Sequence, residues 1–201
     1  MRGRRVRHVV EGVVVVFLCV LQGMPAVGPW ISLMFVPLGY YLLLYLLWYP
    51  EYLEHNLRLI LSPRTLLGQA VAFMGLMLFL AACIQLVRQR GKLVTTGLYS
   101  VVRHPQYLGI TVMTLGTSII SVQLRANGYT AALFIWLVEV LGYVLLACFE
   151  ERSLLREHEE VYQRYRVRAP LIFPVASPAR IPEPLFSMVL ATIIAFVCMF
   201  L

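Results

Sequence analysis

The stretch from Gly97 to Gly109 reads Gly-Leu-Tyr-Ser-Val-Val-Arg-His-Pro-Gln-Tyr-Leu-Gly, a polar, aromatic and basic segment between two long apolar runs. Pro105 disfavours helix at the residue before it and pre-sets its own backbone for a helix start. The stretch therefore predicts a loop that leads into a helix N-terminus. Such a terminus, together with the charge of Arg103, suits a carboxylate or phosphate ligand. The alternative interpretation is a basic loop that marks the cytoplasmic face of a membrane.

The composition around this stretch indicates an integral membrane protein. Of the 201 residues 60% are hydrophobic and 13% are charged, and the mean hydropathy is +0.79. The net charge of +7 comes from arginine-rich clusters, which suit loops beside an anionic membrane face and not a nucleic-acid groove. The four cysteines stand singly in apolar segments. We therefore expect no nucleic-acid partner, no disulfide framework and no metal site.

Windows of about twenty apolar residues mark the expected membrane helices. They predict helices at Val9–Val27, Trp30–Trp48, Leu66–Val87, Tyr107–Val122, Tyr129–Phe149 and Leu185–Leu201. The expected fold is therefore all-α, a multi-pass transmembrane bundle of about five or six spans. It divides into an N-terminal hairpin and interfacial loop (1–64), a core (65–174), and a proline-rich linker with a final helix (175–201).

Small residues and charged residues indicate where individual spans lie in the bundle and how they are oriented in the membrane. The third span carries small residues that permit close helix packing, among them Gly68 and Gly75, and it is expected at the centre of the bundle. Glu139 lies in the middle of the fifth span, where a carboxylate must face protein or water, and we interpret it as structural. Basic clusters at 2–7 and 88–103 both favour the cytoplasm, although three predicted spans separate them. We place the second cluster in the cytosol and leave the N-terminal orientation open.

The chain changes character after Phe149. Leu154, His158, Tyr162 and Tyr165 recur at helical spacing in a charged background, which predicts an amphipathic helix that leaves the membrane. Prolines from 170 to 184 end this helix in an extended linker. Because its tyrosines need an apolar partner, we expect this C-terminal segment to pack over the loop of the opening stretch.

Two blocks of residues resemble a known superfamily. The pattern Gly97-x-Tyr99-x-x-x-Arg103-His104-Pro105-x-Tyr107-x-Gly109 resembles the signature of the isoprenylcysteine carboxyl methyltransferase and phospholipid N-methyltransferase superfamily of membrane enzymes. The second block resembles that superfamily's C-terminal motif, and it reads Glu150-Glu151-x-x-Leu154, Tyr162-x-x-Tyr165 and Pro170-x-x-x-Pro174. The resemblance covers about residues 66–174. It implies methyl transfer from S-adenosylmethionine, held at the cytosolic side of the bundle, to a lipophilic acceptor.

The resemblance also implies a set of site residues. Those expected to bind the cofactor are Tyr99, Arg103, His104, Pro105, Tyr107, Glu150, Tyr162 and Tyr165, and those expected to be catalytic are Glu150, Glu151 and Arg168. S-adenosylmethionine carries a carboxylate, an ammonium, a sulfonium and an adenine. Arg103, His104 and the following helix N-terminus suit its carboxylate, and Glu150 or Glu151 suits its ammonium. The tyrosine rings suit adenine or the sulfonium. The sequence contains no Gly-x-Gly-x-x-Gly after a strand pattern, which argues against a Rossmann site.

This chain departs from the family pattern at two places. It has His158-Glu159 where Phe-Gly is usual, and Ala169-Pro170-Leu171 where Val-Pro-Arg is common, so Arg168 or Arg166 is the candidate replacement for the missing arginine. The motif residues also allow a structural interpretation, with His104 capping a carbonyl, Glu150 and Glu151 as a solvated helix turn, and the tyrosines as core residues.

Other functions and acceptors stay open at this point. One alternative is a sterol-reductase-like, NADPH-dependent membrane reductase, and another is a non-catalytic transporter or scaffold. The acceptor is either a carboxylate of the isoprenylcysteine kind or a phospholipid amine. We expect it to enter sideways from the bilayer, between the fourth and fifth spans and past Gly109 and Gly116.

Overall fold

A computed structural model describes residues 33–48, 63–89, 93–124 and 129–200, and these ranges are entirely helix, turn and loop. In chain order the elements are α3 (Phe35–Trp48), η2 (Pro63–Thr65), α6 (Leu66–Arg88), η3 (Gly97–Ser100), α7 (Pro105–Gln123), α8 (Tyr129–Glu157), α9 (Glu159–Arg168) and α10 (Glu183–Cys198). The all-helical class is confirmed for the described residues.

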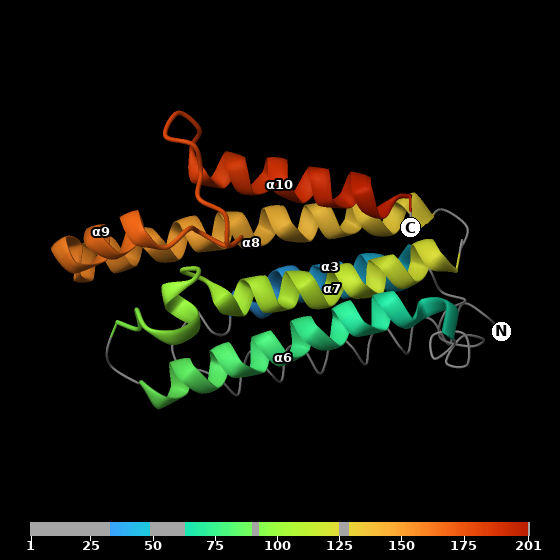
Figure 1. Cartoon of the computed structure of the whole chain (residues 1–201), viewed down its shortest axis with the longest axis horizontal. Coiled ribbons are helices and arrows are strands. Elements are labelled where there is room, and N and C mark those ends of the chain that lie inside the picture. Colours follow the sequence, from blue (N-terminus) through green and yellow to red (C-terminus); the bar gives the residue numbers. More distant parts are fainter. Residues whose placement is uncertain (1–32, 49–62, 90–92, 125–128, 201) are drawn as a thin grey trace.

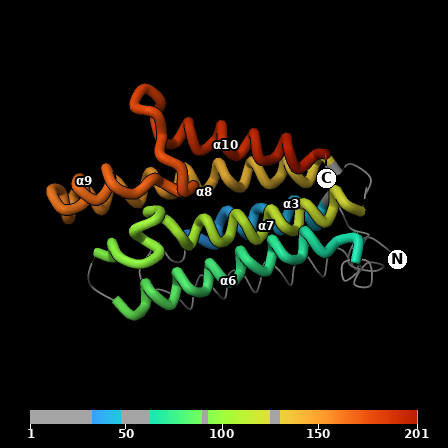
Figure 2. Tube along the Cα trace, in the orientation of Figure 1, coloured from blue at the N-terminus to red at the C-terminus, as the bar shows by residue number. Residues whose placement is uncertain are grey.

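The long helices lie side by side, with α7 between α6 and α8 (Figure 1). Helix α3 lies behind α7 and contacts α8, while α10 packs on the outer side of α8. The trace in Figure 2 shows α9 beyond the end of the bundle, next to the loop that precedes α7. The main apolar core therefore forms where α3, α7, α8 and α10 meet, and the motif-bearing segments gather at one end of it.

Glycines bring α6 and α7 into backbone contact. A Cβ atom on Gly109 would lie 2.5 Å from the backbone nitrogen of Phe79, and one on Gly116 would lie 2.3 Å from that of Ala72. Gly75 meets α7 in the same way, since its Cβ would lie 2.2 Å from the nitrogen of Met113. The expected close packing of the third span is confirmed. Gly109 and Gly116 face α6, however, so they do not line the expected acceptor route between the fourth and fifth spans, and that route stays a prediction.

Polar side chains hold α7 to α3 and α8 inside the bundle. The Tyr41 hydroxyl donates to the carbonyl of Thr114 at 3.1 Å, and Trp136 Nε1 donates to the carbonyl of Thr111 at 2.8 Å. The Tyr143 hydroxyl donates to the carbonyl of Met34 at 2.9 Å and so ties α8 to the start of α3. These buried bonds fix the position of α7, which carries Pro105, Tyr107 and Gly109 of the first motif.

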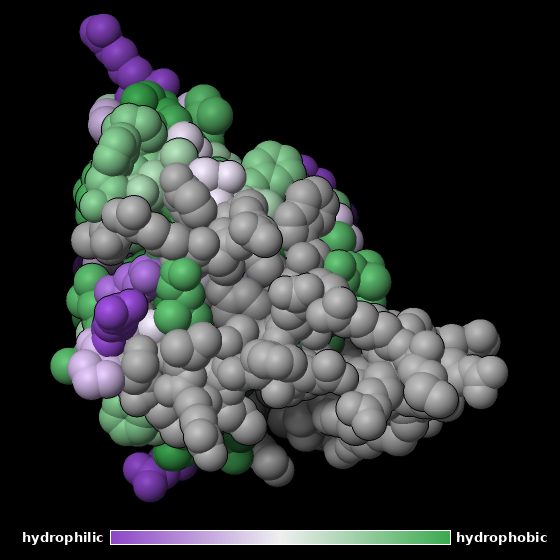
Figure 3. Space-filling view, turned by 90° about the vertical axis from the view of Figure 1, so that its right-hand side faces the viewer, coloured by the Kyte–Doolittle hydropathy of each residue, from purple (hydrophilic) through white to green (hydrophobic). Residues whose placement is uncertain are grey.

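Two described helices, Pro63–Arg88 and Thr130–Glu157, are long and apolar enough to cross a membrane. The helices Phe35–Leu47 and Glu183–Cys198 are apolar but shorter. Figure 3 views the molecule from the end of the bundle at which α10 finishes, and the described residues visible on this face are largely hydrophobic. The count of five or six spans stays a prediction, and the predicted helix Val9–Val27 and turn at 125–128 lie outside the described residues.

Two expectations about the helices need correction. Within the described ranges α6 contacts α7 along its length and exposes large side chains such as Phe73 and Ile84, so α7, and not the third span, holds the central place. The helix expected to leave the membrane after Phe149 is confirmed as far as Glu157, where it is a direct continuation of α8, but it does not run unbroken to Tyr165 as the spacing predicts. The helix breaks at His158, whose φ of −137° and ψ of 41° are not helical, and α9 begins directly after it.

Candidate functional site

The motif loop is anchored on the last turns of α6. Gly97 has a φ of +61°, and a Cβ atom there would lie 2.5 Å from Nε2 of Gln85. The Gln85 side chain donates to the carbonyl of Thr96 and accepts a hydrogen bond from the backbone N–H of Leu98 at 3.1 Å. Glycine is needed at 97 both for the left-handed backbone and for the close approach of this glutamine. Helix α6 therefore sets where the first residues of the motif lie.

The C-terminal segment closes on the same loop. The backbone N–H groups of Arg103 and His104 donate to the carbonyls of Pro170 and Leu171, at 2.9 and 3.2 Å. The Tyr165 hydroxyl donates to the carbonyl of Tyr99 at 2.6 Å. The expected packing of the C-terminal segment over the loop is confirmed.

Arg103 is the centre of a buried ion cluster. Its Nε lies 2.9 Å from Oε1 of Glu151, its Nη2 pairs with Glu183, and its Nη1 donates to the carbonyl of Arg166 at 3.3 Å. The guanidinium has no exposed surface. All three of its nitrogen atoms are thus engaged by protein groups. Arg103 lines the site and its charge faces the carboxylates of Glu151 and Glu183, while its expected contact with a ligand carboxylate stays a prediction.

His104 lies between the two motif carboxylates. Its Nδ1 is 3.3 Å from Oε2 of Glu150, and its Nε2 is 3.6 Å from Oε1 of Glu151. Tyr107 stacks on the imidazole with ring centroids 5.0 Å apart, and its hydroxyl donates to Oε2 of Glu150 at 2.8 Å. Burial lowers the pKa of His104, but the negative charges of Glu150 and Glu151 outweigh it and raise this pKa to about 9. His104 is therefore a cation at neutral pH.

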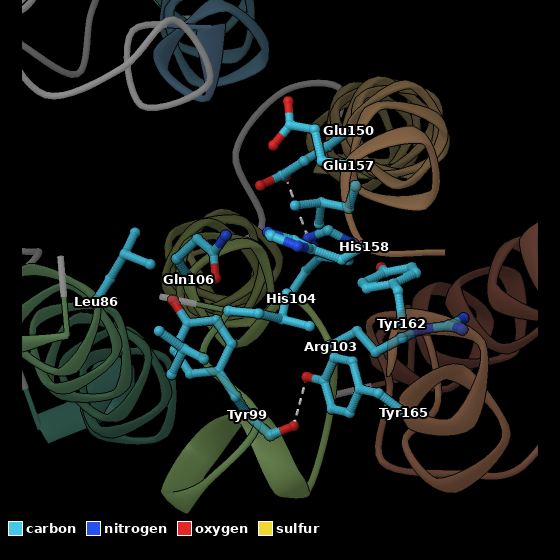
Figure 4. A pocket seen from close by; sticks show the side chains of 13 residues that line it. Leu86, Tyr99, Arg103, His104, Gln106, Glu150, Glu157, His158, Tyr162 and Tyr165 are labelled. Carbon is cyan, nitrogen blue, oxygen red and sulfur yellow. Dashed lines mark hydrogen bonds and ion pairs between the residues drawn. The ribbon is translucent and has the colours of Figure 1, made fainter. Parts of the chain in front are cut away.

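A cavity of about 310 Å³ opens beside this cluster (Figure 4). Six of the expected site residues line it: Tyr99, Arg103, His104, Glu150, Tyr162 and Tyr165. Figure 4 shows the labelled side chains converging from the α6 end, the motif loop, the end of α8 and α9. The two sequence blocks thus form one cavity. Its volume lies at the lower end of the range for small-molecule sites.

The other expected residues lie elsewhere. Pro105 and Tyr107 are buried in the first turn of α7, and Tyr107 supports Glu150. Glu151 is buried in the ion cluster. Arg168 lines a second hollow of about 430 Å³ on the far side of Tyr165, whereas Arg166 lies 3.7 Å from Oε2 of Glu151. Of the two candidate replacements for the missing arginine, Arg166 is thus the one in the cluster.

Sequence reasoning missed several residues of the cavity wall. They are Leu86, Leu93, Val94, Gln106, Leu154, Glu157 and His158. Gln106 is an unspecified position within the first motif, and Glu157 stands two turns after Glu150 on α8. Glu183, the additional partner of Arg103, carries no motif signal because it lies far along the chain.

Several polar atoms in the cavity wall lack a partner within the described part of the chain. The hydroxyl of Tyr99 and Oε1 of Gln106 are buried without a hydrogen bond there. Burial raises the pKa of Tyr99, Tyr162 and Tyr165, so these phenols stay neutral. Buried polar groups in native proteins are nearly always paired. Such atoms on a cavity wall indicate a ligand that supplies the missing partners.

Comparison with known proteins agrees with this geometry. Residues 77–161 match the family model described as phospholipid methyltransferase. This segment therefore belongs to the superfamily of integral membrane methyltransferases that contains the isoprenylcysteine carboxyl methyltransferases and the phospholipid methyltransferases. The match runs from within α6 to the first turn of α9, so it includes the first motif and the Glu150–Leu154 part of the second but ends before Tyr162 and Tyr165. Neither the curated proteins nor the solved structures returned a match.

Proposed function

We propose that this protein transfers the methyl group of S-adenosylmethionine to a lipophilic acceptor at the membrane surface. The observation that carries the proposal is the cavity at the junction of the two motif blocks, with unpaired polar atoms on Tyr99 and Gln106. Members of the matched family are membrane methyltransferases. The cytosolic orientation of the cavity is part of the proposal, because arginines dominate the segment from 88 to 103.

The charges around the cavity fit this cofactor. Arg103, His104 and Arg166 are balanced by Glu150, Glu151 and Glu183. Glu157 also lines the cavity and has no ion-pair partner among the described residues. Counted together, the cavity wall and the ion cluster behind it therefore contain four carboxylates against three cations. S-adenosylmethionine, with one carboxylate and two cationic centres, has a net positive charge, so the site and the cofactor are electrostatically complementary.

Glu150 is the residue best placed to contact the cofactor or the acceptor. Tyr107 and His104 hold its Oε2, and its Oε1 has no hydrogen bond within the described ranges. A carboxylate fixed through one oxygen presents the other in a defined direction. It can accept a hydrogen bond from the ammonium of the cofactor, or take the proton that an amine acceptor must lose. His104 stays protonated between its two carboxylates, so it orients Glu150 and does not act as the base.

The aromatic and apolar walls supply the remaining functions. When bound, S-adenosylmethionine supplies an electrophilic methyl group on its sulfonium. The rings of Tyr99, Tyr162 and Tyr165 offer faces for adenine and for a cation. Leu86 and Leu154 belong to the apolar part of the wall and exclude water. Since transfer to a carboxylate or amine is an in-line displacement, we expect catalysis to consist mainly of positioning.

We place the entry route of the acceptor along the apolar side of the same cavity wall. Leu86 near the end of α6, Leu93 and Val94 after it, and Leu154 on α8 form its apolar side. This route does not pass Gly109 and Gly116, which face α6. Each methylene of an acyl or prenyl chain buried there contributes about 0.8 kcal/mol, so a lipid binds well through its chain alone.

The decisive experiment is a binding titration with S-adenosylhomocysteine in nanodiscs. The Glu150→Gln variant removes a charge-assisted contact worth about 1.5–3 kcal/mol, so we expect its Kd to rise roughly tenfold or more. Glu160→Gln is the matched control, because Glu160 is exposed and its one ion pair with a described residue is with Arg164. Methyl incorporation is then measured with prenylated thiol acids and aminophospholipids. Binding of NADPH in place of S-adenosylhomocysteine, or methylation of water-soluble acceptors alone, contradicts the proposal.

A further inference from the structure

We infer that Glu183, the first residue of α10, is a positioning residue for the methyltransferase site. This inference rests on the proposed function. Glu183 lies outside the family match at 77–161 and outside both sequence blocks. It acts through its ion pair with Arg103, so the helix α10 helps to hold the site in place.

The contacts of Arg103 show how this connection is made. Its side chain is fully buried, and Glu151 and Glu183 are the two carboxylates that neutralise it. Glu151 belongs to α8, which already carries the second motif, whereas Glu183 brings in α10. Arg166 of α9 lies between the same two carboxylates, 3.7 Å from Oε2 of Glu151 and 3.9 Å from Oε2 of Glu183. One guanidinium thereby joins the motif loop to α8, α9 and α10.

The local sequence fixes where the Glu183 carboxylate lies. Pro182 precedes it as the N-cap of α10, and Pro184 follows it in the first turn. Both rings restrict the backbone on either side. A carboxylate in the first turn is also favoured by the helix dipole. Glu183 is therefore presented to Arg103 from a backbone with little freedom.

The position of Arg103 in turn determines part of the cavity wall. Its own N–H and that of His104 bond to the carbonyls of Pro170 and Leu171, and its neighbours in the loop include Tyr99. Without the Glu183 charge, Glu151 is the one carboxylate of the cluster that pairs with both Arg103 and Arg166. The cluster then gains a net positive charge beside a site that is to hold a cation. A guanidinium with one carboxylate fewer is also less firmly held, and the loop that it supports moves more freely.

The test uses Glu183→Gln, which keeps the shape and removes the charge, with Glu183→Asp as the conservative variant. We expect Glu183→Gln to raise the Kd for S-adenosylhomocysteine and the KM for S-adenosylmethionine about tenfold with little change in kcat, as loss of a supporting partner typically does. Glu183→Asp should recover most of the affinity. Glu160→Gln, which removes a carboxylate whose one ion pair with a described residue is with exposed Arg164, should stay within about twofold of wild type.

A second measurement separates this inference from the proposed function. Amide hydrogen exchange of residues 97–104 measures how stably the loop is folded, and it needs no cofactor. The exchange rate should be higher in Glu183→Gln than in Glu160→Gln. Unchanged exchange and unchanged Kd in Glu183→Gln would overturn the inference, as would a lower melting temperature with wild-type affinity. If wild type binds no S-adenosylhomocysteine, the proposed function fails, and faster exchange in the variant still supports the hold of Glu183 on the loop.

Discussion

Replacement of Gly109 by alanine should separate α6 from α7 and destabilise the whole site. The added Cβ would lie 2.5 Å from the backbone nitrogen of Phe79, against an ordinary contact of at least 3.4 Å. The obstacle is backbone and not a movable side chain, so the two helices must separate locally by about 1 Å. Gly142 on α8 offers the control, because a Cβ there would meet the side chain of Pro37 at 3.1 Å.

The expected cost follows from the overlap. Forcing a methyl group into a packed interface typically costs about 1–3 kcal/mol, and here the backbone of α6 cannot rotate away, so we expect about 2–3 kcal/mol for Gly109→Ala. Alanine regains about 1 kcal/mol of helix propensity there, so the net loss is about 1–2 kcal/mol, which for a chain of this size lowers Tm by about 2–8 °C. Alanine gains about 1 kcal/mol in helix propensity at either position, so Gly142→Ala should be close to neutral.

The assay is thermal unfolding of both variants in the same detergent, followed by S-adenosylhomocysteine binding. A Gly109→Ala protein as stable as wild type would refute the backbone contact between α6 and α7. So would equal losses in the two variants, because the distances to Phe79 and to Pro37 predict a clear difference between them.

Two further predictions concern charges at the site. The pKa of His104 is raised from 6.5 to about 9 in the folded protein, so its stabilising contribution is complete below pH 6.5 and is lost as the pH rises through 9. The shift corresponds to about 3 kcal/mol of stability. The Tm of wild type should therefore fall between pH 6.5 and 9, and the Tm of His104→Gln should fall much less. Parallel curves of Tm against pH for the two proteins would contradict the ion pairs of His104. Arg168→Ala should leave the Kd for S-adenosylhomocysteine within about twofold, because Arg168 lines the hollow beyond Tyr165, whereas Arg166→Ala should raise this Kd. Calorimetry in nanodiscs measures both affinities. A tenfold loss of affinity in Arg168→Ala would contradict the placement of Arg168 outside the site.

Hydropathy and proline positions predicted the described helices well. Pro105 begins α7 as predicted, whereas Pro184, predicted to lie in the extended linker, is in the first turn of α10, a position that its fixed φ allows. The continuation of the helix after Phe149 was predicted from the spacing of its apolar residues, but the break at His158 was not, because helical spacing persists on both sides of it. Small residues predicted the close contact of α6, but not which partner it touches, since periodicity alone does not identify the neighbouring helix.

The site could be predicted only as far as the motifs extend. Tyr99, His104 and Glu150 line the cavity because the two blocks contain them. The ion pairs of Arg103 could not be predicted from the sequence, because one of them is with Glu183, which reaches the cluster only through tertiary folding. Arg168 and Arg166 are two positions apart on α9, and the direction of each side chain decides which cavity it joins.

The length of α8 has a consequence for the membrane in which the protein works. Its 29 residues extend about 43 Å at 1.5 Å per residue, whereas the hydrocarbon core of a bilayer is about 30 Å thick. If the helix begins at one face, its last two turns stand clear of the acyl chains on the other, and Glu150 and Glu151 lie where they emerge. That level is the plane of the lipid headgroups. A thicker bilayer would draw these carboxylates toward the hydrocarbon and a thinner one would lift them away, so the rate of methyl transfer should depend on acyl-chain length.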